Sequence, residues 1–398
     1  MGKYFYDSDF ESGKVIVALN KNFNNLNLFA YDINHIFTGI DIKKIEYIFH
    51  SNKMDNSNNM GDILLVYLKN KEKMAVINAI ERLSTSPYVI YAEPDYLYDP
   101  DMIPNDPDFK YLWGMEKIKS PFAWNCTTGS YHVVVGVLDS GIDSNHPDLK
   151  DNLWISSNGQ FINGWNFINN SNNPADETGH GTHVAGTIGA VGNNSIGVTG
   201  VCWNVQLASF KIGDNRIDLA AAINAIYFAN INNIPILNNS WGGRTYSPIL
   251  KYVIEQYDGL FIASAGNSST NNDFLPSYPA SYDSDNIISV AASNQENALS
   301  SFSNYGVKSV DIAAPGTSIL STSLHGEYSY KNGTSMAAPH VAGAAALLKS
   351  HIPFLTTLEM KKIILLSSSK HPNLAKKVLT GGILNIDSMI QMANFFYL

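Results

Sequence analysis

Residues 333–348 read GTSMAAPHVAGAAALL, and this stretch decides the fold of the chain. Ser335 follows a Gly-Thr pair and opens a long run of Ala, Val and Leu, which predicts a buried helix. We expect Pro339 to fall in the first turn of that helix, where its missing N–H is tolerated. A helix N-terminus favours negative charge beside it, so Ser335 is either a helix cap or a nucleophile.

Length and composition limit what the chain can be. Its 398 residues suffice for two domains and a large core. A net charge of -9 argues against binding to nucleic acid or to an anionic membrane. No apolar run reaches the ~18 residues that span a bilayer, and the N-terminal MGKYFYDSDFESG lacks the apolar core of a signal peptide. Cys126 and Cys202 are too few for a disulfide scaffold and form either one bridge or two buried thiols.

Residues 1–100 are predicted to form a separate α+β domain. The expected order β-α-β-β-α-β is ferredoxin-like. Its strands are expected over residues 13–19, 45–50, 61–69 and 87–93, and its helices over residues 23–38 and 72–83. Residues 101–105 belong to an Asp- and Pro-rich stretch that we interpret as an extended linker.

From residue 106 to residue 398 the pattern changes to short apolar strands alternating with Ala-rich helices. Near-continuous apolar runs are typical of buried parallel strands. They cover residues 132–139, 204–211, 234–240, 259–267 and 286–293, and residues 217–232 are predicted to be helical. The sequence therefore predicts an α/β domain whose mostly parallel sheet carries helices on both faces.

Three polar residues interrupt this apolar background where strands end and helices begin. Asp139 ends one predicted strand, and His180 opens a small-residue helix in ETGHGTHVAG. Taken singly, Asp139 could be a strand-end cap and His180 a core histidine. With Ser335 they are the components of a catalytic triad, in which the imidazole takes the serine proton and the carboxylate orients the imidazole. Open α/β sheets place their sites at such strand ends.

A metal site is the main alternative for the two neighbouring histidines. His180 and His183 are three residues apart, a spacing that helical metal ligands can have. The sequence offers no HExxH motif and no evident third ligand, which disfavours zinc.

The chain order Asp, His, Ser is the order of subtilisin and differs from that of chymotrypsin and the α/β-hydrolases. The motifs DSGID (139–143), HGTHVAG (180–186) and GTSMAAPHVAG (333–343) resemble those of the subtilisin-like serine proteases, in particular the thermitase-like branch. The resemblance covers about residues 105–391. It implies a subtilisin-like fold and hydrolysis of peptide bonds through an acyl-enzyme. The absence of a GxSxG motif around Ser335 argues against a lipase or esterase.

The resemblance also implies an oxyanion site. Asn267, in the segment AGN, matches the family asparagine whose amide donates to the oxyanion. A fixed donor aimed at developing negative charge stabilises the transition state more than the ground state. The backbone N–H of Ser335 is the expected second donor.

The segment NNSWGG (238–243) resembles the family's substrate-binding strand, where an extended peptide pairs as an added strand. The pocket for P1, the residue before the scissile bond, is expected to have Ser240, Trp241 and Gly242 on one wall, Ala265 and Gly266 on the other, and Ser277 near its base. For Trp241 the alternative is plain core packing. No charged residue is evident in these segments, so we expect no strong preference for basic P1 residues.

The segment GNNSIGV (192–198) is similar to the family's calcium loop, although its length differs by one residue from the commonest version. The resemblance implies a structural calcium ion, which hard oxygen donors suit. The expected ligands are Asp106, Asp148, the Asn194 side chain and the carbonyls of Val191, Ile196 and Val198. The alternative is a solvated turn without metal.

Residues 1–100 resemble the family's inhibitory propeptide. This implies a zymogen whose own prodomain is an intramolecular inhibitor, with cleavage within residues 96–105. Protein or peptide substrates, a monomeric enzyme and secretion are expected, although no signal peptide is visible.

The resemblance also bears on the cysteines. In the family alignment Cys126 and Cys202 fall near one another, so a single disulfide between them and two free thiols both remain alternatives. The competing functions are a catalytically silent pseudoprotease that binds partners, and an esterase or transacylase using the same triad.

Overall fold

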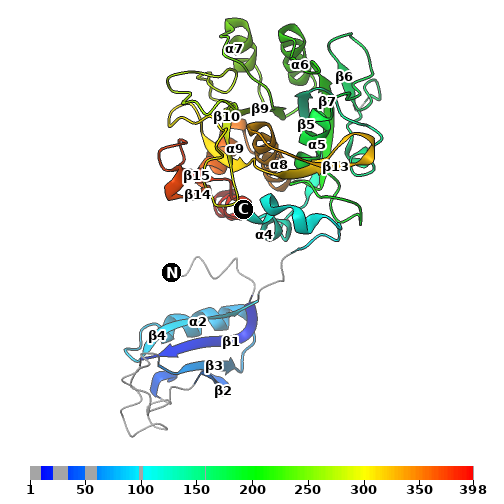
Figure 1. Cartoon of the computed structure of the whole chain (residues 1–398). Coiled ribbons are helices and arrows are strands. Elements are labelled where there is room, and N and C mark those ends of the chain that lie inside the picture. Colours follow the sequence, from blue (N-terminus) through cyan, green and yellow to red (C-terminus); the bar gives the residue numbers. More distant parts are fainter. Residues whose placement is uncertain (1–9, 21–34, 50–60, 98–101, 157, 398) are drawn as a thin grey trace. The chain divides into compact units, whose positions relative to one another are not determined.

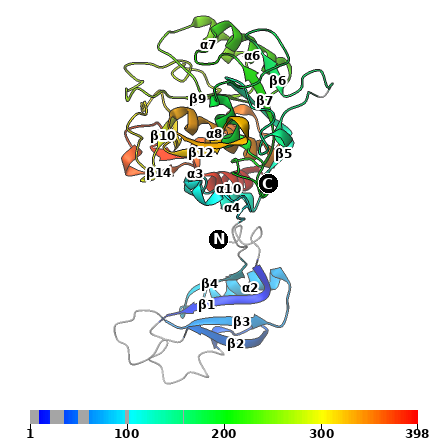
Figure 2. The same cartoon turned by 45° about the vertical axis from the view of Figure 1, so that its right-hand side comes forward.

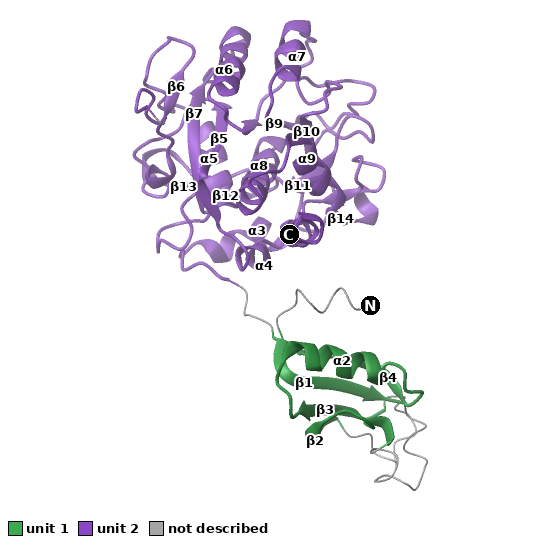
Figure 3. Cartoon of the chain, turned by 180° about the vertical axis from the view of Figure 1, so that it is seen from behind, with its two compact units in different colours: residues 1–100 green, residues 101–398 purple. Residues whose placement is uncertain are grey.

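The computed structural model describes residues 10–20, 35–49, 61–97, 102–156 and 158–397. The chain divides into two compact units, Met1–Pro100 and Asp101–Leu398, which Figure 3 shows in different colours. Each unit has its own hydrophobic core.

The first unit is an antiparallel sheet with the strand order β2-β3-β1-β4 and a helix packed on it. Its elements are β1 (Phe10–Leu19), β2 (Ile42–Phe49), β3 (Ile63–Leu68), α2 (Lys73–Leu83) and β4 (Val89–Tyr96). Val15 and Val17 alternate with outward residues along β1, as a half-buried strand requires. The four strands and the second helix lie where the sequence predicts them, whereas most of the helix predicted over residues 23–38 lies outside the described residues.

The second unit is built on a nine-stranded sheet with the order β14-β15-β11-β10-β9-β8-β5-β7-β6. All neighbouring strands are parallel except β14 and β15. The strands are β5 (Gly129–Asp139), β6 (Gly164–Asn166), β7 (Asn204–Lys211), β8 (Ile236–Asn239), β9 (Leu260–Ser264), β10 (Ile287–Ser293), β11 (Ile312–Pro315), β14 (Ser369–Lys370) and β15 (Gly382–Ile383). A separate hairpin joins β12 (Ile319–Thr322) to β13 (Tyr328–Lys331). The five strands predicted for this part of the chain are confirmed.

Helices cover both faces of the large sheet, as predicted, and α8 lies at the centre of the unit (Figures 1 and 2). The α-helices are α3 (Trp113–Lys117), α4 (Ser120–Trp124), α5 (His180–Gly189), α6 (Leu219–Ile231), α7 (Pro248–Glu255), α8 (Thr334–His351), α9 (Thr357–Leu366) and α10 (Ile386–Tyr397). Alternate residues of strand β9 point to opposite faces of the sheet. Leu260 and Ile262 pack in the core that contains α5 and α8, and Phe261 and Ala263 pack in the core that contains α6 and α7. Among the described helices, none is long and apolar enough to cross a membrane.

The position of Pro339 differs from the prediction. Helix α8 begins at Thr334, so Pro339 is its sixth residue and lies beyond the first turn. A proline there cannot donate to the carbonyl four residues earlier, which is that of Ser335. The hydroxyl of Ser240 donates to this carbonyl instead, at 2.9 Å. The structure thus replaces a lost helical bond with a bond from the end of β8, and the proline is tolerated for that reason.

Both cysteines are free thiols in the structure, so the single disulfide does not form in it. Cys126 is exposed and Cys202 is buried. Burial raises the pKa of the Cys202 thiol far above its ordinary value, which keeps this side chain a neutral core group.

Asp176 holds the N-terminus of α5, the helix that begins at His180. Its Oδ2 accepts hydrogen bonds from the backbone N and the hydroxyl of Thr182, at 2.9 and 2.7 Å. Its Oδ1 accepts from the Ser140 hydroxyl and from the backbone N of Thr178 and Gly179, at 2.8, 2.9 and 3.0 Å. Burial by itself would raise the pKa of Asp176, but these hydrogen bonds outweigh it and hold the pKa below its ordinary value.

We expect Asp176→Asn to destabilise the second unit by about 1–3 kcal/mol at neutral pH, because an amide nitrogen would face buried donors. Because the native pKa is lowered, this stability is present above the ordinary carboxyl pKa of 3.8 and is lost as the pH falls below it. The measurement is denaturant unfolding followed by tryptophan fluorescence, in a Ser335→Ala background that prevents self-cleavage. All six tryptophans lie in the second unit, so the signal reports that unit.

The matched control is Asp218→Asn, the same change at another helix N-terminus. Asp218 caps α6 with a single bond to the backbone N of Ala221, and asparagine caps a helix about as well as aspartate. Equal unfolding free energies for the two variants would contradict the assignment to Asp176.

Candidate active site

The carboxyl ends of β5, β8 and β9 form the edge at which the polar residues gather. The three strands are parallel neighbours, with Leu138 beside Asn239 and Asn239 beside Ala263. Asp139 is the last residue of β5. Ser240 follows the end of β8 directly, and Asn267 lies three residues beyond the end of β9. The sheet therefore brings together groups that are up to 128 positions apart in the sequence.

His180 contacts Asp139 at this edge. The distance between His180 Nδ1 and Asp139 Oδ1 is 2.7 Å, and the backbone N of Ser140 donates to the same oxygen at 2.8 Å. Asp139 Oδ2 is buried and has no hydrogen-bond partner among the described residues. The charge of Asp139 raises the pKa of His180 and outweighs the opposing effect of burial. Because Nδ1 donates to the carboxylate, the neutral imidazole keeps its lone pair on Nε2, as a general base requires.

His183 points away from this pair. Its Nε2 donates to the carbonyls of Ile319 and Ser329, each at 3.0 Å, and so ties α5 to the β12–β13 hairpin. Burial lowers its pKa to about 3. In the part of the chain that the structure describes, no group of three or more His, Cys, Asp or Glu residues could hold a metal ion. His183 is a neutral core histidine.

Ser335 is the second residue of α8, and its hydroxyl turns toward β8. It donates to the carbonyl of Ser240 at 3.0 Å, while the Ser240 hydroxyl donates back to the Ser335 carbonyl at 2.9 Å. Helix α5 begins at His180 and helix α8 begins one residue before Ser335, and these two helices pack against each other. In this conformation the serine hydroxyl is engaged with Ser240 and not with His180. Catalytic hydrogen bonds are often long or misaligned without substrate, so this conformation is compatible with a nucleophile.

Asn267 caps α8 from a distance, and this fixes its amide. Its Oδ1 accepts from the backbone N and the hydroxyl of Thr334, at 2.8 and 2.9 Å. The Thr334 hydroxyl in turn accepts from the backbone N of Gly266 at 3.1 Å. No hydrogen bond of the described part engages Asn267 Nδ2. With its oxygen held by the helix, the amide keeps a donor free beside Ser335.

A cavity of about 280 Å³ opens beside Ser335 and Asn267. Five of the six residues predicted for the substrate pocket line it, namely Ser240, Trp241, Gly242, Gly266 and Ser277. Gly243, at the end of the predicted substrate-binding strand, also lines it. The lining residues that the sequence did not indicate are Arg244, Ser264, Ser268, Asn304 and Thr334. The backbone of Gly243 pairs with that of Tyr278, which joins residues 240–244 to the segment that contains Ser277. Both segments line this cavity.

Ala265 is fully buried and is not one of the lining residues. Its carbonyl accepts from the side-chain amides of Asn272 and Asn304, at 2.9 and 3.1 Å. Asn304 is itself buried, and its Oδ1 accepts from the backbone N of Ser268 at 2.9 Å. Asn304 therefore supports the wall that we assigned to Ala265. It lies 37 positions after Asn267, so nothing in the local sequence pointed to it.

One charged residue lies at the pocket although none is evident in the predicted pocket segments, and the expected lack of a strong preference for basic P1 residues stays a prediction. Arg244 lines the cavity and is exposed at its rim. It directly follows the segment 238–243 that carries the substrate-strand pattern, and this adjacency was the signal that sequence reasoning passed over. The other residues lining the cavity are uncharged.

The predicted calcium loop wraps around two buried carboxylates. Asp106 accepts from the backbone N of Asn193 at 2.7 Å, and Asp148 accepts from the backbone N of Val198 at 2.9 Å. Burial, with a further contribution from the charge of Asp106, raises the pKa of Asp148 to about 6. No cationic side chain of the described part forms an ion pair with either carboxylate. Two adjacent buried carboxylates without a cation fit a site for a hard metal ion.

The remaining predicted ligands fit this site in part. No hydrogen bond of the described part ends on the carbonyl oxygens of Val191, Ile196 or Val198, so all three are available. The Asn194 amide is different, because its Nδ2 donates to Asp148 Oδ1 at 2.8 Å and its Oδ1 accepts from the backbone N of Ile196. A metal ion at this position would need the amide turned over. Three of the six expected ligands are backbone carbonyls and one is an amide, so a calcium ion held by this set would not require three carboxylate or imidazole ligands.

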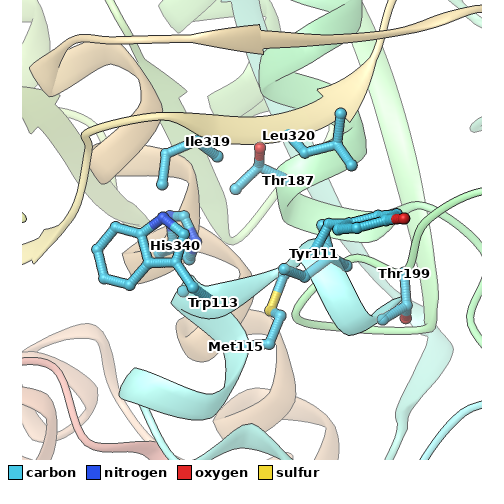
Figure 4. A pocket seen from close by; sticks show the side chains of 10 residues that line it. Tyr111, Trp113, Met115, Thr187, Thr199, Ile319, Leu320 and His340 are labelled. Atoms are coloured by element: carbon cyan, nitrogen blue, oxygen red, sulfur yellow. The ribbon is translucent and has the colours of Figure 1, made fainter. Parts of the chain in front are cut away.

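A second cavity, shown in Figure 4, lies between α8 and the segment leading into α3. Trp113, Thr187 and His340 are among the residues around it. Its volume of about 10 Å³ is that of a single water molecule. Burial lowers the pKa of His340 to about 4, and its Nδ1 contacts the Met336 carbonyl at 2.8 Å. This cavity is too small for a substrate, and His340 is a structural residue.

Comparison with known proteins places this geometry in a family. A model of the subtilase family matches residues 130–383, which is more than half of the chain. A thermophilic serine proteinase of Bacillus sp. (strain AK1) is 37% identical over 277 residues, covering 68% of this chain and 66% of that protein. Thermitase of Thermoactinomyces vulgaris is 38% identical over 253 residues, covering 62% of this chain and 85% of that protein.

A subtilisin-like protease 2 of Plasmodium falciparum is 40% identical over 250 residues, but these cover only 19% of that protein. The chain thus spans slightly less than two thirds of the length of the Bacillus proteinase and about a fifth of the Plasmodium protein. A solved protease structure from Pseudoalteromonas arctica superposes with a TM-score of 0.65 at 28% identity, covering 73% of this chain and all of that one. The chain belongs to the subtilase family, the subtilisin-like serine proteases.

Proposed function

We propose that this chain is a serine endopeptidase made as an autoprocessing zymogen. The observation that carries the proposal is the 2.7 Å contact between His180 Nδ1 and Asp139 Oδ1 at the start of α5, the helix packed against the one that carries Ser335. The contact orients an imidazole as a general base. The unengaged Nδ2 donor of Asn267 and the cavity beside Ser335 support the same function.

The reaction follows from these positions. His180 Nε2 takes the proton of Ser335 Oγ as that oxygen attacks the carbonyl carbon of the peptide bond. The resulting oxyanion is stabilised by Asn267 Nδ2 and by the backbone N–H of Ser335. His180 then gives its proton to the leaving amine, and an acyl-enzyme remains on Ser335. Water attacks the acyl-enzyme with His180 again as base, which releases the acid and restores the serine.

The first unit supports the zymogen part of the proposal. Residues 1–100 form a compact unit with its own core, whose last strand β4 ends at Tyr96. We assign this unit as an intramolecular inhibitor that is separated by cleavage within residues 96–105. We further propose that the mature enzyme is secreted and acts as a monomer on protein or peptide substrates.

A non-catalytic binding scaffold is the alternative function. Such a protein would be expected to lack a member of the triad, whereas this chain has Asp139, His180 and Ser335 together with Asn267. An esterase or transacylase would use the same residues, but the pocket beside Ser335 lies against a segment suited to pairing with an extended peptide.

The experiment that tests the proposal compares the parent chain with its Ser335→Ala variant. We expect the parent to cut itself within residues 96–105 and to react with a fluorophosphonate probe, because both need the serine oxygen. The variant should remain one piece and unlabelled. N-terminal mapping and labelled gels measure the two outcomes. A parent that is uncut and unlabelled in calcium-containing buffer would instead indicate the scaffold.

We expect kcat/KM to rise with pH through an inflection above 6.5, the ordinary histidine pKa. His180 must be neutral to act as a base, and the charge of Asp139 raises its pKa, so the protonated form persists to higher pH. Asp139→Asn should move the inflection downward and lower kcat by about 10⁴-fold, the effect of this change in another serine protease. A peptide-hydrolysis profile from pH 5 to 9 measures both, and an unchanged inflection in Asp139→Asn would rule out this role of Asp139.

We also propose that the loop around Asp106 and Asp148 holds a structural calcium ion. Asp106, Asp148 and the carbonyls of Val191, Ile196 and Val198 would be its ligands, with Asn194 after rotation of its amide. When bound, the ion supplies the positive charge that two adjacent buried carboxylates lack. It stabilises the loop and takes no part in the reaction.

Removal of calcium should therefore lower the melting temperature of the Ser335→Ala protein. An ion present at about 100 times its Kd stabilises the folded state by about 2.7 kcal/mol, which corresponds to several degrees. Calorimetry with and without a chelator measures the shift. Asp148→Asn should lose most of this response, whereas Asp151→Asn, at an exposed residue of the same segment, should keep it. A melting temperature that does not respond to the chelator would exclude the ion.

A further inference from the structure

Arg244 is the one charged residue lining the cavity beside Ser335, and it is the basis of an inference about the substrate. The other lining residues are small or neutral, and no carboxylate lies among them. None of the described residues forms an ion pair or hydrogen bond with Arg244. An arginine that lines a pocket without a partner, in a chain of net charge -9, is available to an anionic group from outside.

The geometry of the attack determines which substrate residue meets this cavity. Ser335 Oγ attacks the carbonyl carbon of P1, so the P1 side chain starts two bonds from the attacked atom. The cavity is lined by Ser335 and Asn267 and also by residues 240–244, so the P1 side chain is the substrate group that meets it. A volume of about 280 Å³ lies just below the range of small-molecule pockets, about 300–1,000 Å³, and suits a single side chain.

The chemistry of the lining favours a carboxylate. A guanidinium binds a carboxylate through two parallel N–H···O bonds, which a neutral amide or an alkyl side chain cannot match. Ser268 and Ser277 also line the cavity and add hydroxyl donors. A lysine or arginine at P1 would instead meet a like charge, with no acid in the lining to offset it.

A second cation lies near His180. Lys331, on β13, is half-buried, and its charge opposes protonation of His180 and His183. Lys331 does not line the P1 cavity. Its charge partly offsets the negative charges of Asp139 and Asp176 near His180, which lowers the electrostatic cost of bringing an acidic peptide to this edge of the sheet.

We propose that Arg244 makes this enzyme select an acidic residue, glutamate or aspartate, at P1. The proposal rests on the proteolytic function assigned above and names the substrate class of that site. Arg244 is a specificity-determining residue in this proposal, because it contacts the substrate side chain and not the reacting atoms.

The test uses mature enzyme and four peptides that are identical except for Glu, Gln, Leu or Lys at P1, with the cleaved bond confirmed by mass spectrometry. We expect kcat/KM for Glu to exceed that for Gln by about tenfold, the order of a charge-assisted hydrogen bond. Arg244→Gln should abolish this ratio, and Arg244→Glu should reverse the order of Glu and Lys. A Glu-to-Gln ratio near one in the parent, or the parent ratio kept in Arg244→Gln, overturns the proposal.

The matched control is Arg216→Gln. Arg216 is exposed and lines a neighbouring cavity of about 480 Å³, which shares Trp241, Gly242 and Gly243 with the P1 cavity. Its loss removes the same charge from the same region, so the Glu-to-Gln ratio should stay at the parent value. An equal fall of the ratio in both variants would assign the preference to general electrostatic attraction, and not to Arg244.

Failure of the underlying function gives a different result. If Gln and Leu peptides are cleaved without preference for Glu, only the role of Arg244 is overturned. If no peptide is cleaved by an enzyme with Ser335 intact, the proteolytic function fails and the P1 preference fails with it.

Discussion

The active site depends on the way in which the N-terminus of α8 is held against the ends of β8 and β9. Thr334, the first helical residue, is bound by Asn267 through its N–H and its hydroxyl. Ser335 exchanges two hydrogen bonds with Ser240. One unpaired backbone donor of the helix terminus, the Thr334 N–H, is thereby satisfied by a residue that lies beside the reacting atoms, while the Ser335 N–H stays available to an oxyanion. The same few bonds cap a helix, fix an amide and position a serine, so the fold and the site share one set of contacts.

The charges at this site are divided between the interior and the surface. Asp139 and Asp176 are buried, and each is held by the backbone or side chains around the start of α5. The cations are less buried: Arg244 is exposed at the cavity beside Ser335, and Lys331 is half-buried. The buried Asp139 therefore orients the imidazole, Asp176 holds the helix that carries it, and the exposed Arg244 is left for the proposed contact with substrate. This division leaves a cationic group exposed at the pocket of a protein whose net charge is -9.

The elements and the reacting residues could be predicted because their signals are local. The apolar runs gave the strands, and Asp139, His180 and Ser335 each lie in a motif at a strand or helix boundary. The support of the site could not be predicted in this way. Asn304 supports the carbonyl of Ala265, which is distant from it in the sequence. Asp176 binds Ser140, which is also distant in the sequence, and the first turn of α5. Ala265 was assigned to a wall that Asn304 supports. Arg244 directly follows the substrate-strand pattern, but a place next to a pattern does not tell which side chains line a pocket, and the pairing of Gly243 with Tyr278 is a contact between distant segments.

Pro339 places helix stability and active-site geometry in opposition. Alanine is the better helix former at this position, and in isolation it would strengthen α8. Alanine would also restore an N–H directed at the Ser335 carbonyl, where it would compete with the Ser240 hydroxyl for the same oxygen. A change that stabilises the helix would thus weaken the attachment of the serine to β8. Thermostability in this protein has to be sought at positions other than the sixth residue of its most buried helix.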